Sequence, residues 1–529
     1  MGNFLTKSRL LGLGAALGAA FALQPAAAQI EVSDSNTGTA VVVPYYTVNG
    51  GWRTLINLTN TSDNSLAVKF RLHESRNSRD VLDFNIALSP RDVWTAFIEQ
   101  SPMGRPSLQT TDRSCTIPIG VRDNGAEASE LAYSNEFADH TATDGDMTRT
   151  REGYIEILVM GETEGNGEAL NNAQRNSTAY LAEHVDGEPR DCGRVQLDFV
   201  RRTAQFEGDD PNETISGQDA GGVQVGSGSP LARLGSVDGG GANESTIGYG
   251  PIVTPDPLKV NASLVNQDTG RAAGIESLHI AGFGVDANLV TAQQFPWFLE
   301  PTIASSDGLW STSALPAIGA GIASSQVKNE WTSNDNTGGT AEWVVTFPTK
   351  RFQADFDNDN VQAACNAWRN DTGTVGGVSA NPVVAGDCPD EGFPTVFQDG
   401  DNGRADIVAQ YDIYDREEGT AQVQVDGPIV SPAPPPDIEI DNLPYESNVI
   451  RIGRNASSAA STLESPVALA VDTNQLVSNA DSGWLEMTFI DDDMVTAYPV
   501  TGFVYKQRDF GNPGLNFGQA TEHAYTIDN

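Results

Sequence analysis

The chain has 529 residues and a formal net charge of -40, from 71 acidic and 31 basic residues. A surface this acidic repels nucleic-acid phosphates and anionic lipids, so we expect neither as a partner. Hydrophobic residues make up 39% of the chain and include eight tryptophans, which excludes disorder throughout. A chain of this length exceeds what one hydrophobic core usually serves, so we expect two or three domains.

The first 28 residues have the three parts of a secretion signal. Lys7 and Arg9 supply positive charge, residues 10–23 are apolar, and small residues at Ala26 and Ala28 precede Gln29. The alternative is an N-terminal anchor helix, but the apolar stretch is short for a membrane span. The sequence therefore predicts removal of residues 1–28 and export to the cell surface or the medium, with no transmembrane segment.

Alternation of apolar and polar side chains predicts β-strands that bury one face. Residues 66–73 alternate in this way, so we expect Lys69, Arg71 and His73 to face solvent. Glu156 is expected to be a solvated or edge residue of a more apolar strand, which returns to the same sheet. The other strands predicted in the N-terminal part are residues 54–60, 82–88, 92–98 and 153–160.

The predicted fold class is mostly β, with antiparallel β-sandwich domains, long polar loops and little helix. We expect an N-terminal β-sandwich domain over residues 29–205. Residues 206–250 are rich in Gly, Ser and Asp and are expected to form a linker or loop. Alternating segments resume after that, so a C-terminal β-rich region, of one or more domains, is expected over residues 251–529.

Four cysteines in an exported protein suggest two disulfides. Three pairings are possible, and proximity in the sequence favours Cys115–Cys192 and Cys365–Cys388. The alternative is a four-cysteine metal site, but such sites usually contain a Cys-X-X-Cys pair, which this chain lacks.

Two loops offer carboxylates at the alternating spacing that lets a looped backbone turn several of them toward one calcium ion. The second loop also contains Gly403, which suits a tight turn, although the full spacing of a known calcium loop is missing. The alternative for both is a solvated loop in a very acidic chain. The predicted calcium ligands are Asp355, Asp357 and Asp359 in the first loop, and Asp399, Asp401 and Asp406 in the second.

The sequence contains no motif that indicates catalysis. A Gly-X-Ser-X-Gly nucleophile motif, a phosphate-binding loop and a dinucleotide-binding glycine pattern are all missing, and the five histidines do not fall at metal-ligand spacing. Pairs of carboxylates suited to glycoside hydrolysis arise by chance among 71 acidic residues. We therefore expect a protein that is not an enzyme, and a secreted hydrolase is the weakest alternative.

Several segments spread over the chain form a recognisable set: residues 43–52 (VPYYTVNGGW), 54–60, 76–79, 81–85, 89–94, 153–156, 342–350 (EWVVTFPTK), 448–450 and 499–503. Together they resemble a family of exported, surface-layer-like proteins from marine and other Gram-negative bacteria. The resemblance carries no catalytic residues. It implies a secreted, β-rich protein that covers the cell surface.

The first functional hypothesis is therefore a structural cell-surface protein that self-associates with the help of divalent cations. Such cations would also link it to outer-membrane lipopolysaccharide or envelope glycan. The alternative is an extracellular glycan- or ligand-binding β-sandwich protein. It would use aromatic residues such as Trp52, Trp94 and Trp331, although tryptophans in strands are more often core residues.

If the two acidic loops bind calcium, this ion should raise the melting temperature more than sodium chloride of equal ionic strength does. Sodium screens the general repulsion but does not replace a coordination site. The double variant Asp357→Ala plus Asp401→Ala should lose the calcium-specific part of the shift in a thermal melt. Equal effects of the two salts on the unmodified protein would contradict the assignment.

Overall fold

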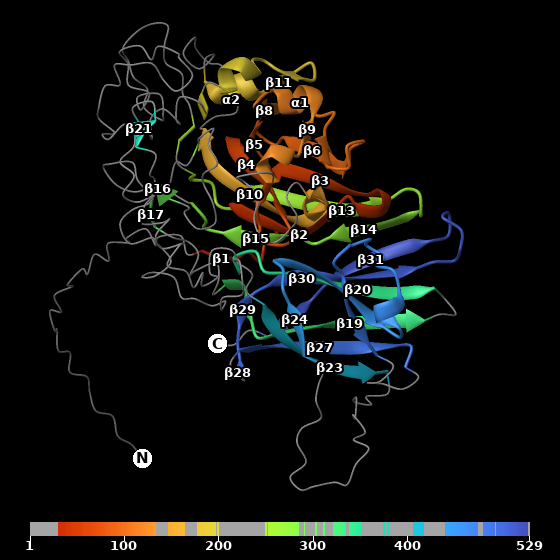
Figure 1. Ribbon diagram of the computed structural model, residues 1–529. Coiled ribbons are helices and arrows are strands. Elements are labelled where there is room, and N and C mark those ends of the chain that lie inside the picture. Colours follow the sequence, from red (N-terminus) through yellow and green to blue (C-terminus); the bar gives the residue numbers. More distant parts are fainter. Residues whose placement is uncertain are drawn as a thin grey trace, which may run out of the picture.

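Antiparallel β-strands stacked in layers form most of the computed structural model (Figure 1). The structure describes residues 30–133, 146–163, 177–196, 198–199, 249–250, 252–284, 290, 302–303, 310–312, 321–334, 338–350, 374–375, 378–379, 406–416, 440–473, 480–491 and 494–526. The mostly-β fold predicted from the sequence is confirmed, and the helices α1 (Gly120–Asn124) and α2 (Thr178–Ala182) are short. No helix in these ranges is long and apolar enough to cross a membrane.

Two antiparallel sheets face each other in the N-terminal sandwich. The first sheet contains, in spatial order, β1 (Glu31–Val32), β15 (Leu278–Ala281), β2 (Ala40–Thr47), β10 (Glu152–Thr163), β4 (Ser65–Glu74), β5 (Asp80–Leu88) and β8 (Cys115–Ile117). The second sheet contains β14 (Arg271–Ile275), β13 (Leu258–Asn266), β3 (Trp52–Asn60), β6 (Val93–Gln100), β7 (Pro106–Gln109) and β9 (Ala126–Glu127).

The two sheets enclose a core of aliphatic and aromatic side chains. Phe70 of β4 contacts Phe84 of β5 and Trp94 of β6, with ring centroids 5.0 and 5.7 Å apart. Ile56 of β3 belongs to the same cluster. Burial alternates along β3 and β6, as the pattern of residues 54–60 and 92–98 predicts. Each large side chain removed from water here contributes about 1.5–3 kcal/mol.

The first sheet is buried on its other face as well. Leu158 of β10 lies in a second cluster with Leu181 of α2, and all side chains of β4 are buried. The prediction that Lys69, Arg71 and His73 face solvent is therefore wrong, because these side chains are 1%, 0% and 2% exposed. Covering segments from later in the chain turn the expected solvent face of β4 into an interior face.

A third sheet forms the C-terminal sandwich. Its main path is β24 (Ile440–Leu443), β23 (Ile407–Asp415), β27 (Ser482–Asp491), β19 (Gln326–Asn334), β20 (Gly339–Thr346), β25 (Ser447–Gly453) and β26 (Leu469–Asp472). Further strands join this path: β28 (Met494–Val495), β30 (Thr501–Arg508), β31 (Phe517–Glu522) and β32 (Ala524–Thr526).

The third sheet folds back on itself at β19. This strand pairs with β27 over most of its length, but its last residues, Ser333 and Asn334, pair with β20. The two halves of the sheet enclose a core that contains Trp331, Trp343 and Phe489. All pairings in this sheet are antiparallel except that of β25 with β26.

Short elements lie outside the large sheets. The strand pairs are β11 (His184–Val185) with β12 (Glu188–Pro189), β16 (Thr302–Ile303) with β17 (Trp310–Thr312), β18 (Ala323–Ser324) with β29 (Tyr498–Pro499), and β21 (Thr374–Val375) with β22 (Val378–Ser379). The 3-10 helices are η1 (Asn49–Gly51), η2 (Glu130–Tyr133), η4 (Met147–Arg151) and η7 (Ala456–Ser458).

The domain boundary expected at residue 251 is corrected by the strand pairing. β13 and β15, both beyond that residue, pair with β3 and β2 of the N-terminal sandwich. Without them, β2 and β3 would expose unpaired backbone N–H and C=O groups at a sheet edge. The N-terminal sandwich thus extends to residue 281, and most of the expected linker at 206–250 lies outside the described residues.

The two sandwiches share one apolar core. Tyr45 packs edge-on against Phe503, and Trp52 packs edge-on against Tyr505, with ring centroids 6.4 and 5.5 Å apart. Val344 of β20 also belongs to the N-terminal cluster. Figure 1 shows β20 and β30 directly below β2 and β14, at the boundary between the two sandwiches. The halves are therefore one packed unit.

A connecting segment, residues 459–468, fills the join between the sandwiches, and we call it the clamp segment. Trp52 Nε1 donates a hydrogen bond to the carbonyl oxygen of Thr462 over 3.1 Å. Ser465 Oγ donates to Glu152 Oε1 over 2.8 Å, and Glu152 also accepts from Tyr45. These bonds fasten the clamp segment to the N-terminal sandwich.

Glu342 of β20 holds the same segment from the C-terminal side. Its carboxylate accepts hydrogen bonds from the backbone N–H groups of Thr462 and Leu463, at 2.6 and 2.8 Å. Burial raises the pKa of Glu342 to about 7, although the bonds from Leu463 and Thr462 favour the charged form. Desolvation therefore outweighs the hydrogen bonds at this carboxyl group.

The raised pKa predicts that this residue makes the fold less stable as pH increases. Between the ordinary pKa of 4.5 and about 7, the folded state holds more protons than the unfolded state, so its stability falls by about 3 kcal/mol across this window. Denaturant titrations of the wild type and Glu342→Gln from pH 4 to 8 measure this difference. Because Gln cannot ionise, the variant should lack that part of the pH dependence, whereas parallel stability curves would contradict the assignment.

Candidate functional site

The structure describes only one of the six predicted calcium ligands. Asp355, Asp357, Asp359, Asp399 and Asp401 lie outside the described residues, and Asp406 is exposed immediately before β23. Among the described residues, no group of three or more His, Cys, Asp or Glu side chains is arranged to hold a metal ion. Calcium binding therefore stays a prediction.

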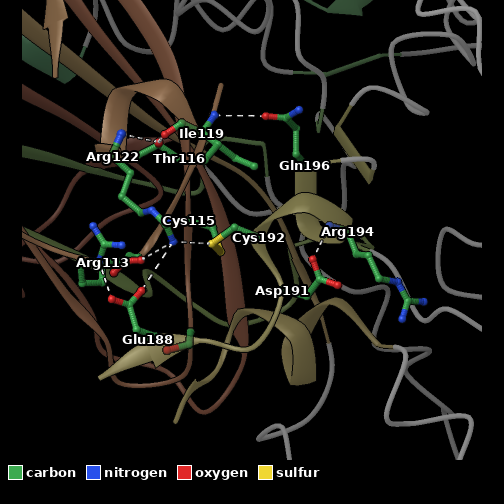
Figure 2. Close-up of a disulfide and its surroundings, with 12 residues drawn as sticks. Arg113, Cys115, Thr116, Ile119, Arg122, Glu188, Asp191, Cys192, Arg194 and Gln196 are labelled. Carbon is green, nitrogen blue, oxygen red and sulfur yellow. Dashed lines mark hydrogen bonds and ion pairs between the residues drawn. A yellow bond between two sulfur atoms is a disulfide. The ribbon is translucent and has the colours of Figure 1, made fainter. Parts of the chain in front are cut away.

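A disulfide joins Cys115 of β8 to Cys192, the pairing expected from the sequence (Figure 2). The Cα atoms are 5.2 Å apart, and the two residues are separated by 77 positions. In the loop-entropy view, a cross-link over such a loop stabilises the fold by about 4 kcal/mol. It attaches the segment that covers the first sheet to the edge of that sheet. Cys365 and Cys388 lie outside the described residues.

Polar contacts support the disulfide on both sides. Gln196 Oε1 accepts a hydrogen bond from the backbone N–H of Ile119 over 3.1 Å, and Arg122 Nη1 lies 3.2 Å from Cys192 Sγ. Arg113 and Glu188, whose side chains are exposed, form an ion pair at 2.7 Å next to the disulfide (Figure 2). These contacts fix the disulfide-linked segment against the edge of the first sheet.

Charged side chains on the covered face of the first sheet form a buried ionic network. Arg71 Nη1 lies 2.6 Å from Glu156 Oε1, and Arg71 Nη2 lies 3.1 Å from Asp83 Oδ2. Lys69 Nζ lies 3.2 Å from Asp83 Oδ1. Glu156, which the sequence suggests is solvated, is fully buried. Its charge is tolerated because Arg71 lies on the neighbouring strand.

His73 completes this network between two carboxylates. Its Nδ1 lies 2.8 Å from the carbonyl oxygen of Ser78, which only accepts, so this nitrogen carries the proton. Nε2 then faces Glu156 Oε2 at 3.5 Å, while Asp80 lies 3.4 Å from Nδ1. The ring stacks on Tyr154, with centroids 4.7 Å apart.

Electrostatics in the network favours mutual neutralisation over catalysis. Burial lowers the pKa of Lys69 to about 8, an effect that Asp83 partly offsets. Burial would also lower the pKa of Arg71, but the carboxylates of Asp83 and Glu156 raise it above its ordinary value. Arg71 thus stays charged beside its carboxylate partners, as in a structural ion-pair network.

A surface cleft of about 560 Å³ lies at one end of the C-terminal sandwich. Arg416 and Trp484 line it from the half of the sheet that contains β23 and β27, and Arg508 and Phe517 line it from the hairpin of β30 and β31. This volume is within the range of about 300–1,000 Å³ that is usual for small-ligand sites. We call it the hairpin cleft.

An aromatic pair forms one wall of the hairpin cleft. Trp484 is 39% exposed, unusual for so large an apolar side chain. Tyr414, its direct partner on β23, stacks on it with ring centroids 4.3 Å apart and an interplanar angle of 7°. Trp484 lines the cleft, and Tyr414 stacks on its indole ring without lining the cleft itself. The stacking restricts the orientation of the indole before any ligand binds.

An ion pair connects the two walls of the hairpin cleft. Lys506 of β30 lies 2.5 Å from Glu330 of β19. Both residues line the cleft, as does Gln519 of β31. The pair bridges the two walls, and its carboxylate and ammonium groups provide hydrogen-bonding partners in the cleft.

Polar side chains continue the surface next to the aromatic pair. On the same face of the sheet, next to the aromatic pair, Asp412 of β23 lies opposite Glu486 of β27. Lys328 of β19 lies 3.1 Å from Glu486. Burial and the charge of Glu486 raise the pKa of Asp412. The outer face of these strands therefore presents an aromatic pair followed by a row of charged groups.

The tryptophans selected from the sequence are core residues. Trp52, Trp94 and Trp331 are no more than 1% exposed. Trp484 is not among the tryptophans selected from the sequence, although the sequence contains a pattern that indicates its exposure. In residues 482–491, Leu485 alternates onto the buried face, so Trp484 falls on the polar face. A tryptophan on the polar face of an alternating strand predicts an exposed aromatic surface.

Comparison with known proteins adds no assignment. No protein-family model matches the chain, and no curated protein and no solved structure is significantly similar to it. The proposed function therefore depends on the geometry of the chain itself.

The buried ionic network predicts a large effect of Arg71→Met on stability. The substitution leaves the fully buried Glu156 without its arginine, so we expect a loss of about 3–5 kcal/mol in a denaturant titration. Arg53→Met is the matched control, because Arg53 pairs with Glu99 on an exposed strand face and its side chain is 42% exposed. That change should cost less than about 1 kcal/mol. Similar losses for both variants would show that the network contributes nothing specific.

Proposed function

We propose that the protein is an exported, non-enzymatic glycan-binding protein and that the hairpin cleft is its binding site. The observation that carries this proposal is the partly exposed Trp484, which lines the cleft and stacks on Tyr414. This is the second of the three functional hypotheses that the sequence suggests, now argued from a different tryptophan.

An exposed, supported indole suits a sugar ring. One face of a pyranose presents mainly C–H bonds, which pack against the negative face of an aromatic ring, while the hydroxyl groups point outward around the edge. Tyr414 holds the indole in place before a ligand arrives, which reduces the entropy lost on binding.

The rim of the cleft supplies partners for those hydroxyl groups. Glu330 is an acceptor, Lys506 and Arg416 are donors, and Gln519 is both. A few placed polar groups around an aromatic wall are characteristic of small-ligand sites. Binding is therefore the function that this site supports best.

The surface-layer hypothesis remains a prediction of the sequence. Its calcium loops fall almost entirely outside the described residues, so the geometry neither favours nor weakens it. A glycan-binding cleft is compatible with it, because a surface protein must attach to envelope components.

The proposal predicts that Trp484→Ala strongly weakens oligosaccharide binding. Isothermal titration against a panel of neutral and acidic oligosaccharides should show at least one ligand for the wild type. Loss of a central aromatic contact of about 2 kcal/mol or more corresponds to at least about 30-fold weaker binding. Tyr414→Ala should weaken binding less, because Tyr414 supports the indole without lining the cleft.

Phe97→Ala is the matched control. Phe97 lies on the outer face of β6 in the other sandwich, beneath Arg53 at 5.8 Å, and does not line the cleft. This variant should bind as the wild type does. If no member of the panel binds the wild-type protein, or if Trp484→Ala and Phe97→Ala weaken binding equally, the assignment of the cleft is refuted.

A further inference from the structure

The hairpin of β30 and β31 carries exposed aromatic side chains beside the hairpin cleft. Phe517, the first residue of β31, is 51% exposed and lines the cleft. Its ring centroid lies 6.4 Å from that of Phe510, which is also exposed. A large apolar side chain left in water at the border of a cavity is typical of an interaction surface. The cleft therefore has a second aromatic side chain, on the hairpin wall.

The strand register separates this side chain from Trp484. Trp484 lies directly opposite Glu330 across the pairing of β27 with β19. Glu330 lies 2.5 Å from Lys506, which is opposite Gln519 across the pairing of β30 with β31. Phe517 is two residues from Gln519 and so lies on the same face of β31. Neighbouring strands are about 4.8 Å apart, close to the width of one pyranose ring, so a ring packed on Trp484 does not reach Phe517.

We propose that the hairpin cleft binds a stretch of a glycan chain, with one sugar ring packed on Trp484 and a later ring of the same chain packed on Phe517. This inference rests on the proposed glycan-binding function and adds the length class of the ligand. An oligosaccharide covers both aromatic side chains, whereas a single sugar covers only one of them. The stacking of Trp484 on Tyr414 does not by itself indicate how many rings are bound.

The size and lining of the cleft suit such a ligand. A volume of about 560 Å³ is usual for a drug-sized molecule, which is closer in size to a disaccharide than to a single hexose. The polar residues Glu330, Lys506 and Gln519 lie between the two aromatic side chains. A glycan chain has the matching pattern, because its apolar ring faces are flanked by hydroxyl groups that donate and accept hydrogen bonds.

The linkage between sugars strengthens contacts that are weak one at a time. A ring bound on Trp484 holds the rest of the chain near Phe517, so the second contact forms at a high effective concentration. The C–H groups of a pyranose pack on the phenyl ring as they do on the indole. The affinity should therefore rise with chain length until both aromatic side chains are covered, and then level off.

The test is a titration with oligosaccharides of increasing length. The 1,4-linked oligomers of glucose, of N-acetylglucosamine and of galacturonic acid, from disaccharide to hexasaccharide, are titrated against the wild-type protein by calorimetry. We expect the hexasaccharide of at least one series to bind about tenfold or more tightly than its disaccharide. Phe517→Ala should remove most of this gain and leave the affinity for the disaccharide within about twofold. Trp484→Ala should weaken binding at every length.

Leu515→Ala is the matched control. Leu515 lies on the same hairpin, is at least as exposed as Phe517, and is not among the residues that line the cleft. Its removal takes away exposed apolar surface nearby and should leave the gain with length intact. Phe517→Trp keeps an aromatic surface and should also keep the gain. Circular dichroism and melting curves of each variant establish that it is folded.

The possible outcomes separate the two proposals. Equal binding of disaccharide and hexasaccharide, weakened by Trp484→Ala, overturns this inference and keeps the glycan-binding function. A gain with length that persists in Phe517→Ala, or is lost equally in Leu515→Ala, also overturns the second contact. If sedimentation shows that Phe517→Ala instead dissociates a dimer, the hairpin surface is a contact between copies and the inference is wrong. Binding of no oligosaccharide overturns both proposals.

Discussion

The packing of Trp52 on Tyr505 and of Tyr45 on Phe503 determines how the rest of the molecule is arranged. These contacts place Val344 of β20, and Phe503 and Tyr505 of β30, in the core of the N-terminal sandwich. Strand β30 shows the consequence, because Tyr505 points into the shared core and the next residue, Lys506, lines the hairpin cleft. One wall of the candidate site is thus anchored by the contact that joins the two sandwiches.

Sequence alternation predicted the fold class and several strands, and it failed where a second layer covers a sheet. It is correct for β3 and β6, whose outer faces are open. It fails for β4, because a charged face buried against partners has the same pattern as a solvated face. Arg71 and Glu156 are 85 positions apart, and only the pairing of β4 with β10 brings them together.

The candidate site was predictable in part. The polar-face position of Trp484 can be read from the sequence, since Leu485 and Met487 mark the buried face of the same strand. The cleft itself cannot, because it forms only where the hairpin of β30 and β31 approaches β19 and β27. A tryptophan count without strand phase selects core residues such as Trp52 and Trp94, whereas Trp331, also a core residue, lines the base of the hairpin cleft.

The closing of the N-terminal sandwich by β13 to β15 has a consequence for the order of folding. Thr39 Oγ1 donates to the carbonyl oxygen of Ile280, 241 positions later, and β2 lacks one of its two neighbours until β15 is present. Non-local pairing of this kind makes folding slow. During synthesis, the first half of the chain therefore has an open strand edge for as long as the second half is being made. Such an edge is open to mispairing with other chains, so timely completion of the polypeptide protects this protein from aggregation.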